Sequence, residues 1–176
     1  MRLLIHYAGD VHQPLHASTR INKNYPKGDR GGNDFPLPQA HTTDELHQVW
    51  DSILFEYEGY LDLPFSTSDW SDLSTTAAGL MKKYPINATV ANDLNPVHWA
   101  ADSYKITEEF VYKGVKENEA VPQSYVDKGR QLAETQIVHG GTRLANLLIS
   151  LNLSDLEFLK DIPEESHELV DPLFLH

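Results

Sequence analysis

The chain has 176 residues, 40% of them hydrophobic, which suits a single domain with a substantial apolar core. No apolar run reaches the roughly 18 residues of a transmembrane helix, so we expect no membrane span; the absence of cysteine excludes disulfides but leaves the compartment open. Its 14 basic and 26 acidic residues give a net charge of -12, which excludes binding of nucleic acid through phosphate neutralisation along an extended track.

Residues 2–12 are predicted to form a helix, because apolar residues recur with helical spacing at Leu3, Leu4, Tyr7, Ala8 and Val11. His6 and Asp10 lie four residues apart on the polar side of this helix and therefore project together. Pro14 ends the helix and places His16 at the start of a loop. His12 is two positions away from the polar line, so we expect it to be a neighbour of the site and not a ligand. The first turn has no N-cap before it, and we expect Met1 to be an internal start.

Residues 17–42 are predicted to be a long loop, rich in asparagine, glycine, proline and charged residues. The loop contains the sequence Gly-Asp-Arg-Gly-Gly-Asn-Asp at positions 28–34. Its three glycines suit backbone that must approach another group closely. A plain surface turn is the alternative reading of this segment.

A capping-box pattern at residues 42–45 predicts the start of a second helix. We expect its core side to carry Leu46, Val49, Trp50, Ile53, Leu54 and Tyr57. His47 and Asp51 lie beside this stripe and are again four residues apart. Trp50 belongs to the apolar stripe, which favours a buried side chain over a platform for a nucleobase.

Three further helices are predicted. The first covers residues 69–83; the second starts at Asn95 and Pro96, with Trp99, Ser103, Ile106 and Phe110 on one face; the third covers residues 125–151. Gly140 and Gly141 weaken the last helix intrinsically, so we expect another helix to pack closely there. His98 is expected at the surface. Residues 152–176 form an acidic extension with no predicted structure. The whole pattern predicts an all-α, mostly antiparallel bundle with a metal cleft between its helices.

Five residues form a candidate metal site: His6, Asp10, His16, His47 and Asp51. Imidazole and carboxylate ligands together suit zinc, and a catalytic zinc takes three protein ligands and leaves one position open. His16, His47 and Asp51 are sufficient for one such site. A single His-x-x-x-Asp pair is more simply a surface salt link, but two pairs plus a further histidine favour metal.

Three motifs in this order resemble the S1/P1 class I nucleases: the run from His6 to His16, the glycine-rich segment 28–33, and Leu-His-Gln-Val-Trp-Asp at residues 46–51. The resemblance implies the phospholipase C/P1 nuclease fold and a cluster of three zinc ions. Family members carry four further metal ligands before the first motif, including an N-terminal tryptophan. None of these is in this chain, which therefore resembles the C-terminal portion of a longer enzyme.

The resemblance also implies residue roles. His6 and Asp10 would belong to the zinc pair that generates the nucleophile, with Asp10 as the bridging, catalytic carboxylate. His16, His47 and Asp51 would hold the third zinc, beside the leaving 3'-oxygen. The glycine-rich loop would lie beside the cleft, and Asn33 and Asp29 are candidates for contacts with substrate or with metal ligands.

The implied activity is cleavage of single-stranded DNA and RNA to 5'-phosphate products, together with removal of 3'-phosphates from nucleotides. We expect this chain to hold one complete zinc site and to be nearly inactive alone, because half of the nucleophile site is missing. The alternatives are a zinc-dependent phospholipase C and a zinc-binding fragment without turnover. The resemblance implies a monomer, secreted or in a lysosome-like compartment. Sequons at Asn87 and Asn152 permit glycosylation in a secreted parent chain.

Overall fold

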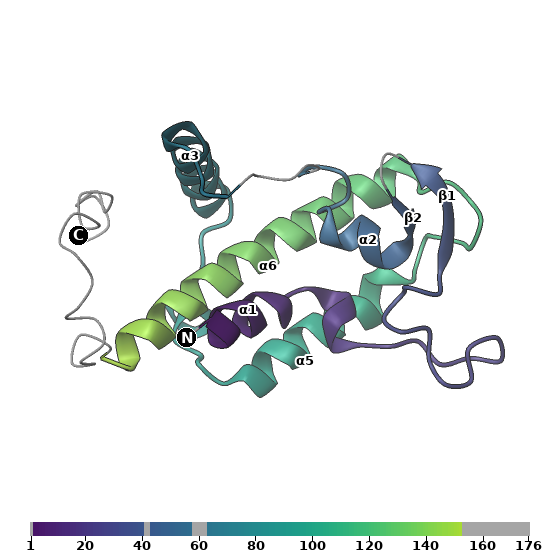
Figure 1. Cartoon of the computed structure of the whole chain (residues 1–176). Helices are drawn as coiled ribbons and strands as arrows, with labels where there is room; N and C mark the ends of the chain where they lie inside the picture. Colours follow the sequence, from purple (N-terminus) through teal and green to yellow (C-terminus); the bar gives the residue numbers. More distant parts are fainter. Residues whose placement is uncertain (1, 41–42, 58–62, 153–176) are drawn as a thin grey trace.

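The computed structural model describes residues 2–40, 43–57 and 63–152 (Figure 1). In chain order its elements are α1 (Arg2–Asp10), the 3-10 turn η1 (Pro14–Ala17), β1 (Pro36–Ala40), β2 (Thr43–Glu45), α2 (Leu46–Asp51), α3 (Thr67–Lys83), α4 (Ala88–Ala91), α5 (Pro96–Ile106), the π-helical turn η2 (Thr107–Val111) and α6 (Gln123–Ser150). The expected all-α class is confirmed, since the only sheet among the described residues is the two-stranded β1–β2 pair. The acidic extension lies outside the described residues, apart from Asn152.

The long helix α6 runs through the molecule and organises the bundle (Figure 1). Helices α1, α3 and α4 all contact α6, and α5 contacts η1 and η2. At Gly140 there is a close approach, because a Cβ there would lie 3.2 Å from the ring of His12, but His12 belongs to the turn that follows α1 and not to a helix. At Gly141 the same explanation is wrong, since nothing lies within 4 Å of such an atom.

Local capping signals place two of the helix starts. Ser66 and Asp69 form a reciprocal capping box that begins α3 at Thr67, two residues earlier than predicted. Asn95 caps α5 by accepting a hydrogen bond from the Val97 N–H at 3.0 Å, and proline occupies the first turn as expected. The start of α5 was read from sequence because its cap is made by residues within a few positions of the helix, whereas the Ser66 cap of α3 was not recognised.

The predicted second helix is wrong in its start and its length. Residues 43–45, where the helix was predicted to begin, form β2. This strand pairs antiparallel with β1, which lies inside the segment 17–42 that was predicted to be a loop. The side chain of Glu45, the actual N-cap of α2, makes no capping hydrogen bond. The helix ends at Asp51 because Ile53, Leu54 and Phe55 adopt left-handed φ angles of 52°, 54° and 69°.

The predicted apolar stripe of the first helix is only partly buried. Ala8 packs inside, but Leu3 and Tyr7 are 67% and 61% exposed. The helix itself ends at Asp10, two residues earlier than predicted. Helical periodicity identifies a face but not the surface that covers it, and among the described residues only one side of α1 is covered.

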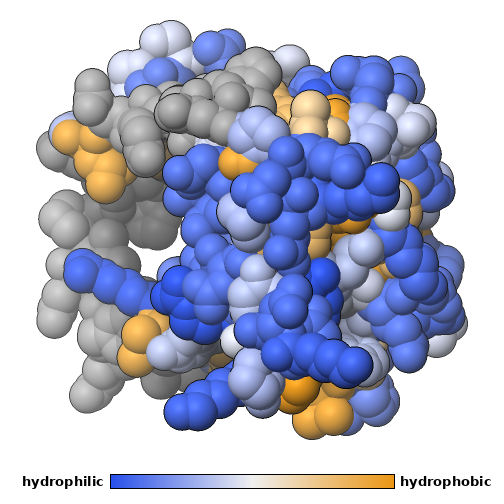
Figure 2. Space-filling model, turned by 90° about the vertical axis from the view of Figure 1, so that its right-hand side faces the viewer, coloured by the Kyte–Doolittle hydropathy of each residue, from blue (hydrophilic) through white to orange (hydrophobic). Residues whose placement is uncertain are grey.

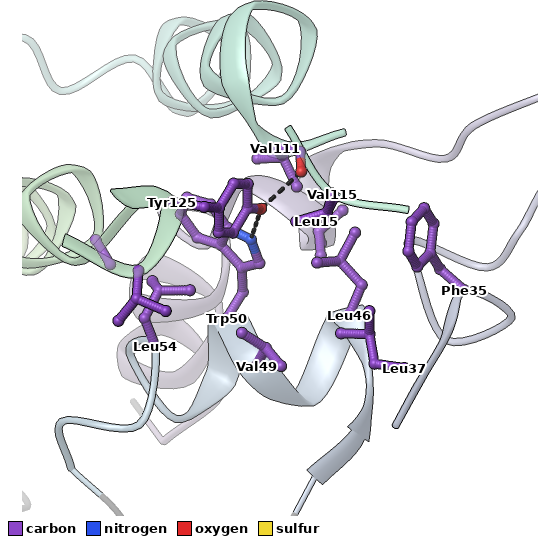
Figure 3. Close-up of a cluster of buried hydrophobic side chains, with 12 residues drawn as sticks. Leu15, Phe35, Leu37, Leu46, Val49, Trp50, Leu54, Val111, Val115 and Tyr125 are labelled. Atoms are coloured by element: carbon purple, nitrogen blue, oxygen red, sulfur yellow. Dashed lines mark hydrogen bonds between the residues drawn. The ribbon is translucent and has the colours of Figure 1, made fainter. Parts of the chain in front are cut away.

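A buried cluster around α2 forms the main core (Figure 3). Trp50 is buried as predicted, and its indole N–H donates a hydrogen bond to the Tyr125 hydroxyl oxygen at 2.9 Å. That hydroxyl in turn donates to the Val111 carbonyl oxygen at 2.6 Å. The cluster joins α2, η2 and α6 and thereby fixes the helix that carries His47 and Asp51.

The visible surface is mostly polar. The face shown in Figure 2 is mainly hydrophilic, with separate small apolar areas. Among the described residues, no helix has both the length and the apolar character needed to cross a bilayer.

Candidate metal centre

Three neighbouring elements bring the five predicted ligands into one continuous row. His6 and Asp10 come from α1, His16 from η1, and His47 and Asp51 from α2. His6 Nε2 lies 3.2 Å from Asp10 Oδ2, which lies 3.7 Å from His16 Nδ1. His16 Nε2 then lies 3.4 Å from Asp51 Oδ1, and Asp51 Oδ2 lies 3.5 Å from His47 Nε2. The spatial grouping predicted from the two helical pairs and His16 is thus present.

One end of the row has the geometry of a metal site. His16, His47 and Asp51 each offer a ligand atom, and the three atoms lie within 4.8 Å of one another. The two imidazole rings stack with centroids 5.0 Å apart. His47 Nδ1 lies 2.7 Å from the Gly31 carbonyl oxygen, which can only accept, so this nitrogen carries the proton and Nε2 presents its lone pair. Two imidazoles and a carboxylate with this orientation fit zinc.

The protonation states of this end are tuned by the contacts within it. The hydrogen bond with Asp51 raises the pKa of His16, against the opposing effect of burial. Burial alone would raise the pKa of the Asp51 carboxyl, but hydrogen bonds with His16 and Gln13 outweigh it and lower that pKa. Asp51 is therefore an anion at neutral pH and available to a cation.

His12 lies outside the row, as predicted, and has a structural role. Its Nδ1–H donates to the Ala8 carbonyl oxygen at 2.7 Å, and its Nε2 accepts from Arg143 at 3.1 Å. Burial lowers the pKa of His12 to about 4, so the ring is neutral at pH 7. With both nitrogens engaged, His12 has no free donor atom for a metal.

The glycine-rich loop supports the row from one side. Asp29 is fully buried, and its Oδ1 accepts hydrogen bonds from the backbone N–H groups of Arg20 and Gly32 at 2.9 and 3.2 Å. The structure thus gives Asp29 a role in holding the loop, with no solvent-facing atom for substrate. Asn33 is half-buried and donates to the Arg30 carbonyl oxygen at 2.6 Å; its contact with substrate stays a prediction.

Two hollows open beside the row. One, of about 430 Å³, is bordered by Asp10, His16 and Asp51 and has an apolar wall on α2, α6 and their neighbours: Trp50, Ile53, Ala133, Ile137 and Leu144. The other, of about 620 Å³, is bordered by His16, His47, Tyr7 and Arg30. A molecule bound in either hollow next to these residues would contact the His/Asp row directly.

Sequence reasoning missed two partners of the ligands. The Gly31 carbonyl oxygen orients His47, and the Gln13 side chain donates to Asp51 Oδ1 at 2.9 Å. The three glycines did signal a close backbone approach, and Gly31 passes against the Leu15 carbonyl as that signal implies. Nothing in the sequence marks Gln13, because its partner lies 38 positions along the chain.

Comparison with known proteins agrees with these features. Residues 1–152 match the family model described as S1/P1 Nuclease. The chain is 32% identical to Endonuclease 1 of Arabidopsis thaliana over 154 residues, which cover 82% of this chain and 47% of that protein. It is also 27% identical to Endonuclease 2 of the same plant over 155 residues, 81% of this chain and 48% of that protein. The chain thus spans about half the length of the curated relatives it matches.

Proposed function

The chain belongs to the S1/P1 nuclease family, and we propose that its His/Asp row is the zinc centre of a phosphodiesterase. The proposed substrates are single-stranded DNA and RNA, cut to 5'-phosphate products, and 3'-nucleotides, which lose their phosphate. The observation that carries the proposal is the convergence of His16, His47 and Asp51, with ligand atoms within 4.8 Å of one another. A secreted or lysosome-like location and a monomeric state stay predictions.

The residues of the row divide into two groups by position. His16, His47 and Asp51 would hold a zinc ion on the side of the leaving 3'-oxygen. His6 and Asp10 lie at the other end, where Asp10 Oδ2 lies between a nitrogen of His6 and a nitrogen of His16, and they would act on the side of the attacking water. When bound, zinc supplies a Lewis acid that stabilises negative charge on phosphoryl oxygens and lowers the pKa of water.

The surroundings of the row suit a local grip on nucleic acid. A net charge of -12 disfavours a long phosphate track, so binding must rely on one phosphate and its neighbouring base. The 430 Å³ hollow has an apolar wall directly beside Asp51, which suits a flat nucleobase. Arg30 borders the second hollow together with His47, and its guanidinium is paired with Asp34 at 2.7 Å, so a phosphate bound there would have to compete with that carboxylate.

Zinc stoichiometry tests the metal site directly. We expect the chain, loaded with zinc and dialysed, to retain about one tight ion by elemental analysis, since one three-ligand group is complete. His47→Ala should lose that ion because it removes one of the three donors. His98→Ala is the matched control: His98 is exposed and pairs with Asp93, away from the row.

Two results would contradict the site. Wild-type protein that retains no zinc, or His47→Ala protein that retains as much as wild type, would show that these residues do not bind it. Parallel assays on single-stranded DNA, 3'-AMP and phosphatidylcholine then identify the substrate class. Weak turnover of the DNA and 3'-AMP is the result expected of this chain alone. Turnover of the lipid alone would replace the nuclease proposal with a phospholipase, and zinc binding with no turnover at all would leave a metal-binding fragment.

A further inference from the structure

Gln13 lies between Asp10 and His16 in the sequence. Its side chain caps η1, which carries His16, and also contacts Asp51 at the end of α2. It follows α1, where its backbone N–H donates to the Asp10 carbonyl oxygen at 2.9 Å. Its own backbone is extended, with φ of -83° and ψ of 120°, and it is the N-cap of η1. The side chain is half-buried and borders the same hollow as His16 and Asp51.

The two ends of the Gln13 amide have different partners, and chemistry decides which end is which. The Leu15 backbone N–H can only donate, so it must face the amide oxygen Oε1, which caps η1. The amide nitrogen Nε2 then faces the Asp51 carboxylate, which can only accept, and donates to Oδ1 at 2.9 Å. The orientation of the amide is therefore determined from both sides.

This arrangement couples two ligands that belong to different elements. The hydrogen bond from the Leu15 N–H to Gln13 Oε1 stabilises the short turn that carries His16. The hydrogen bond from Gln13 Nε2 to Asp51 Oδ1 restricts rotation of the Asp51 carboxylate. His16 Nε2 lies 3.4 Å from the same Oδ1 atom, so the turn, the amide and the carboxylate form one connected unit. Side chains that hold metal ligands in place in this way raise metal affinity without touching the ion.

We propose that Gln13 is a positioning residue that sets His16 and Asp51 in register for metal binding. The inference rests on the proposed zinc site. It adds that the amide of Gln13 fixes the relative positions of two residues of that site. Capping of η1 needs only the amide oxygen, and orientation of Asp51 needs only the N–H donor. A substitution can therefore remove the donor and keep the acceptor.

Two substitutions separate these functions. Gln13→Ala removes both bonds. Gln13→Glu keeps the length of the side chain and an acceptor for the Leu15 N–H, but it cannot donate to Asp51 when ionised. Zinc affinity is measured on the full 176-residue chain by titration against a chromophoric chelator, and the absorption spectrum of the Co²⁺ form reports the ligand geometry. The control is Gln48→Ala, an exposed glutamine on α2 next to His47.

We expect both Gln13 variants to bind zinc about 10–100-fold more weakly than wild type and to show altered Co²⁺ spectra. The metal-free melting temperature of Gln13→Glu should fall, because its carboxylate would face the Asp51 carboxylate in place of the amide donor. Weaker zinc binding by both variants, only one of which adds a charge, identifies the lost donor as their shared cause.

The outcomes are distinguishable. If wild-type protein binds no zinc, the proposed site is wrong and the role of Gln13 is wrong with it. If wild type binds zinc and Gln13→Glu binds it equally well or more tightly, the positioning role alone is overturned and Gln13 is only a cap. If Gln48→Ala weakens binding as much as Gln13→Ala, the effect is not specific to Gln13 and the inference is also overturned.

Discussion

Trp50→Ala lowers the free energy of unfolding by about 3–5 kcal/mol, as expected when a fully buried aromatic side chain is truncated. The indole is 2% exposed and packs edge-on against Phe110 and Tyr125, with ring centroids 6.3 and 6.4 Å apart. Its removal leaves a cavity between α2, η2 and α6. It also takes away the N–H donor of the Tyr125 hydroxyl, which keeps its bond to the Val111 carbonyl.

Urea unfolding in the presence of EDTA measures this loss without a contribution from bound metal. Trp70→Ala is the matched control, since Trp70 is 51% exposed on α3 and its ring contact in the structure is with Phe65. That variant should lose at most about 1 kcal/mol. Equal losses in the two variants would mean that the cluster around Trp50 is not the core that holds α2.

Gly31→Ala destabilises the protein by about 2–4 kcal/mol and weakens zinc binding at the same time. Gly31 is buried with φ of 64°, a conformation that residues with a Cβ seldom adopt. The added methyl group would overlap the Leu15 carbonyl oxygen and lie 3.2 Å from the Ser18 carbonyl oxygen. Both of these oxygens are backbone atoms, so the overlap can be relieved only if the backbone of the loop moves.

That movement carries the Gly31 carbonyl away from His47 Nδ1, which it now contacts at 2.7 Å. Loss of such an orienting bond costs about 10–100-fold in metal affinity. Urea unfolding of the metal-free protein and zinc competition titration are the two measurements. Gly79→Ala is the control, because nothing lies within 4 Å of a Cβ there and alanine should stabilise α3 by about 0.5–1 kcal/mol. A Gly31→Ala protein with wild-type stability would contradict the close approach to Leu15.

Features made by residues near one another in the chain were predictable. The His6/Asp10 and His47/Asp51 pairs follow from helical spacing alone, and the start of α5 follows from Asn95 and Pro96. The long helix α6 was predicted to within two residues at its start because its apolar spacing continues over many turns. In each case the decisive interaction joins positions a few residues apart.

Local patterns failed where a distant segment decided the conformation. Residues 42–45 match a capping-box pattern, yet pairing with β1 holds residues 43–45 extended. The apolar run after Asp51 continues a helical pattern, but the chain turns into left-handed geometry and Leu54 still reaches the core. The exposure of Leu3 and Tyr7 could not be predicted from the sequence either, because helical periodicity does not indicate whether another element covers the apolar face.

By itself, the sequence identified which side chains form the His/Asp row, because ligand chemistry and helical spacing are properties of the residues themselves. Only the tertiary structure decided how they meet. It brings His16 next to Asp51, 35 positions further along the chain, turns the Gly31 carbonyl toward His47 and sets Gln13 between η1 and Asp51. A backbone carbonyl or an amide donor has no sequence signature, and its partner is chosen by how the loop and helices pack.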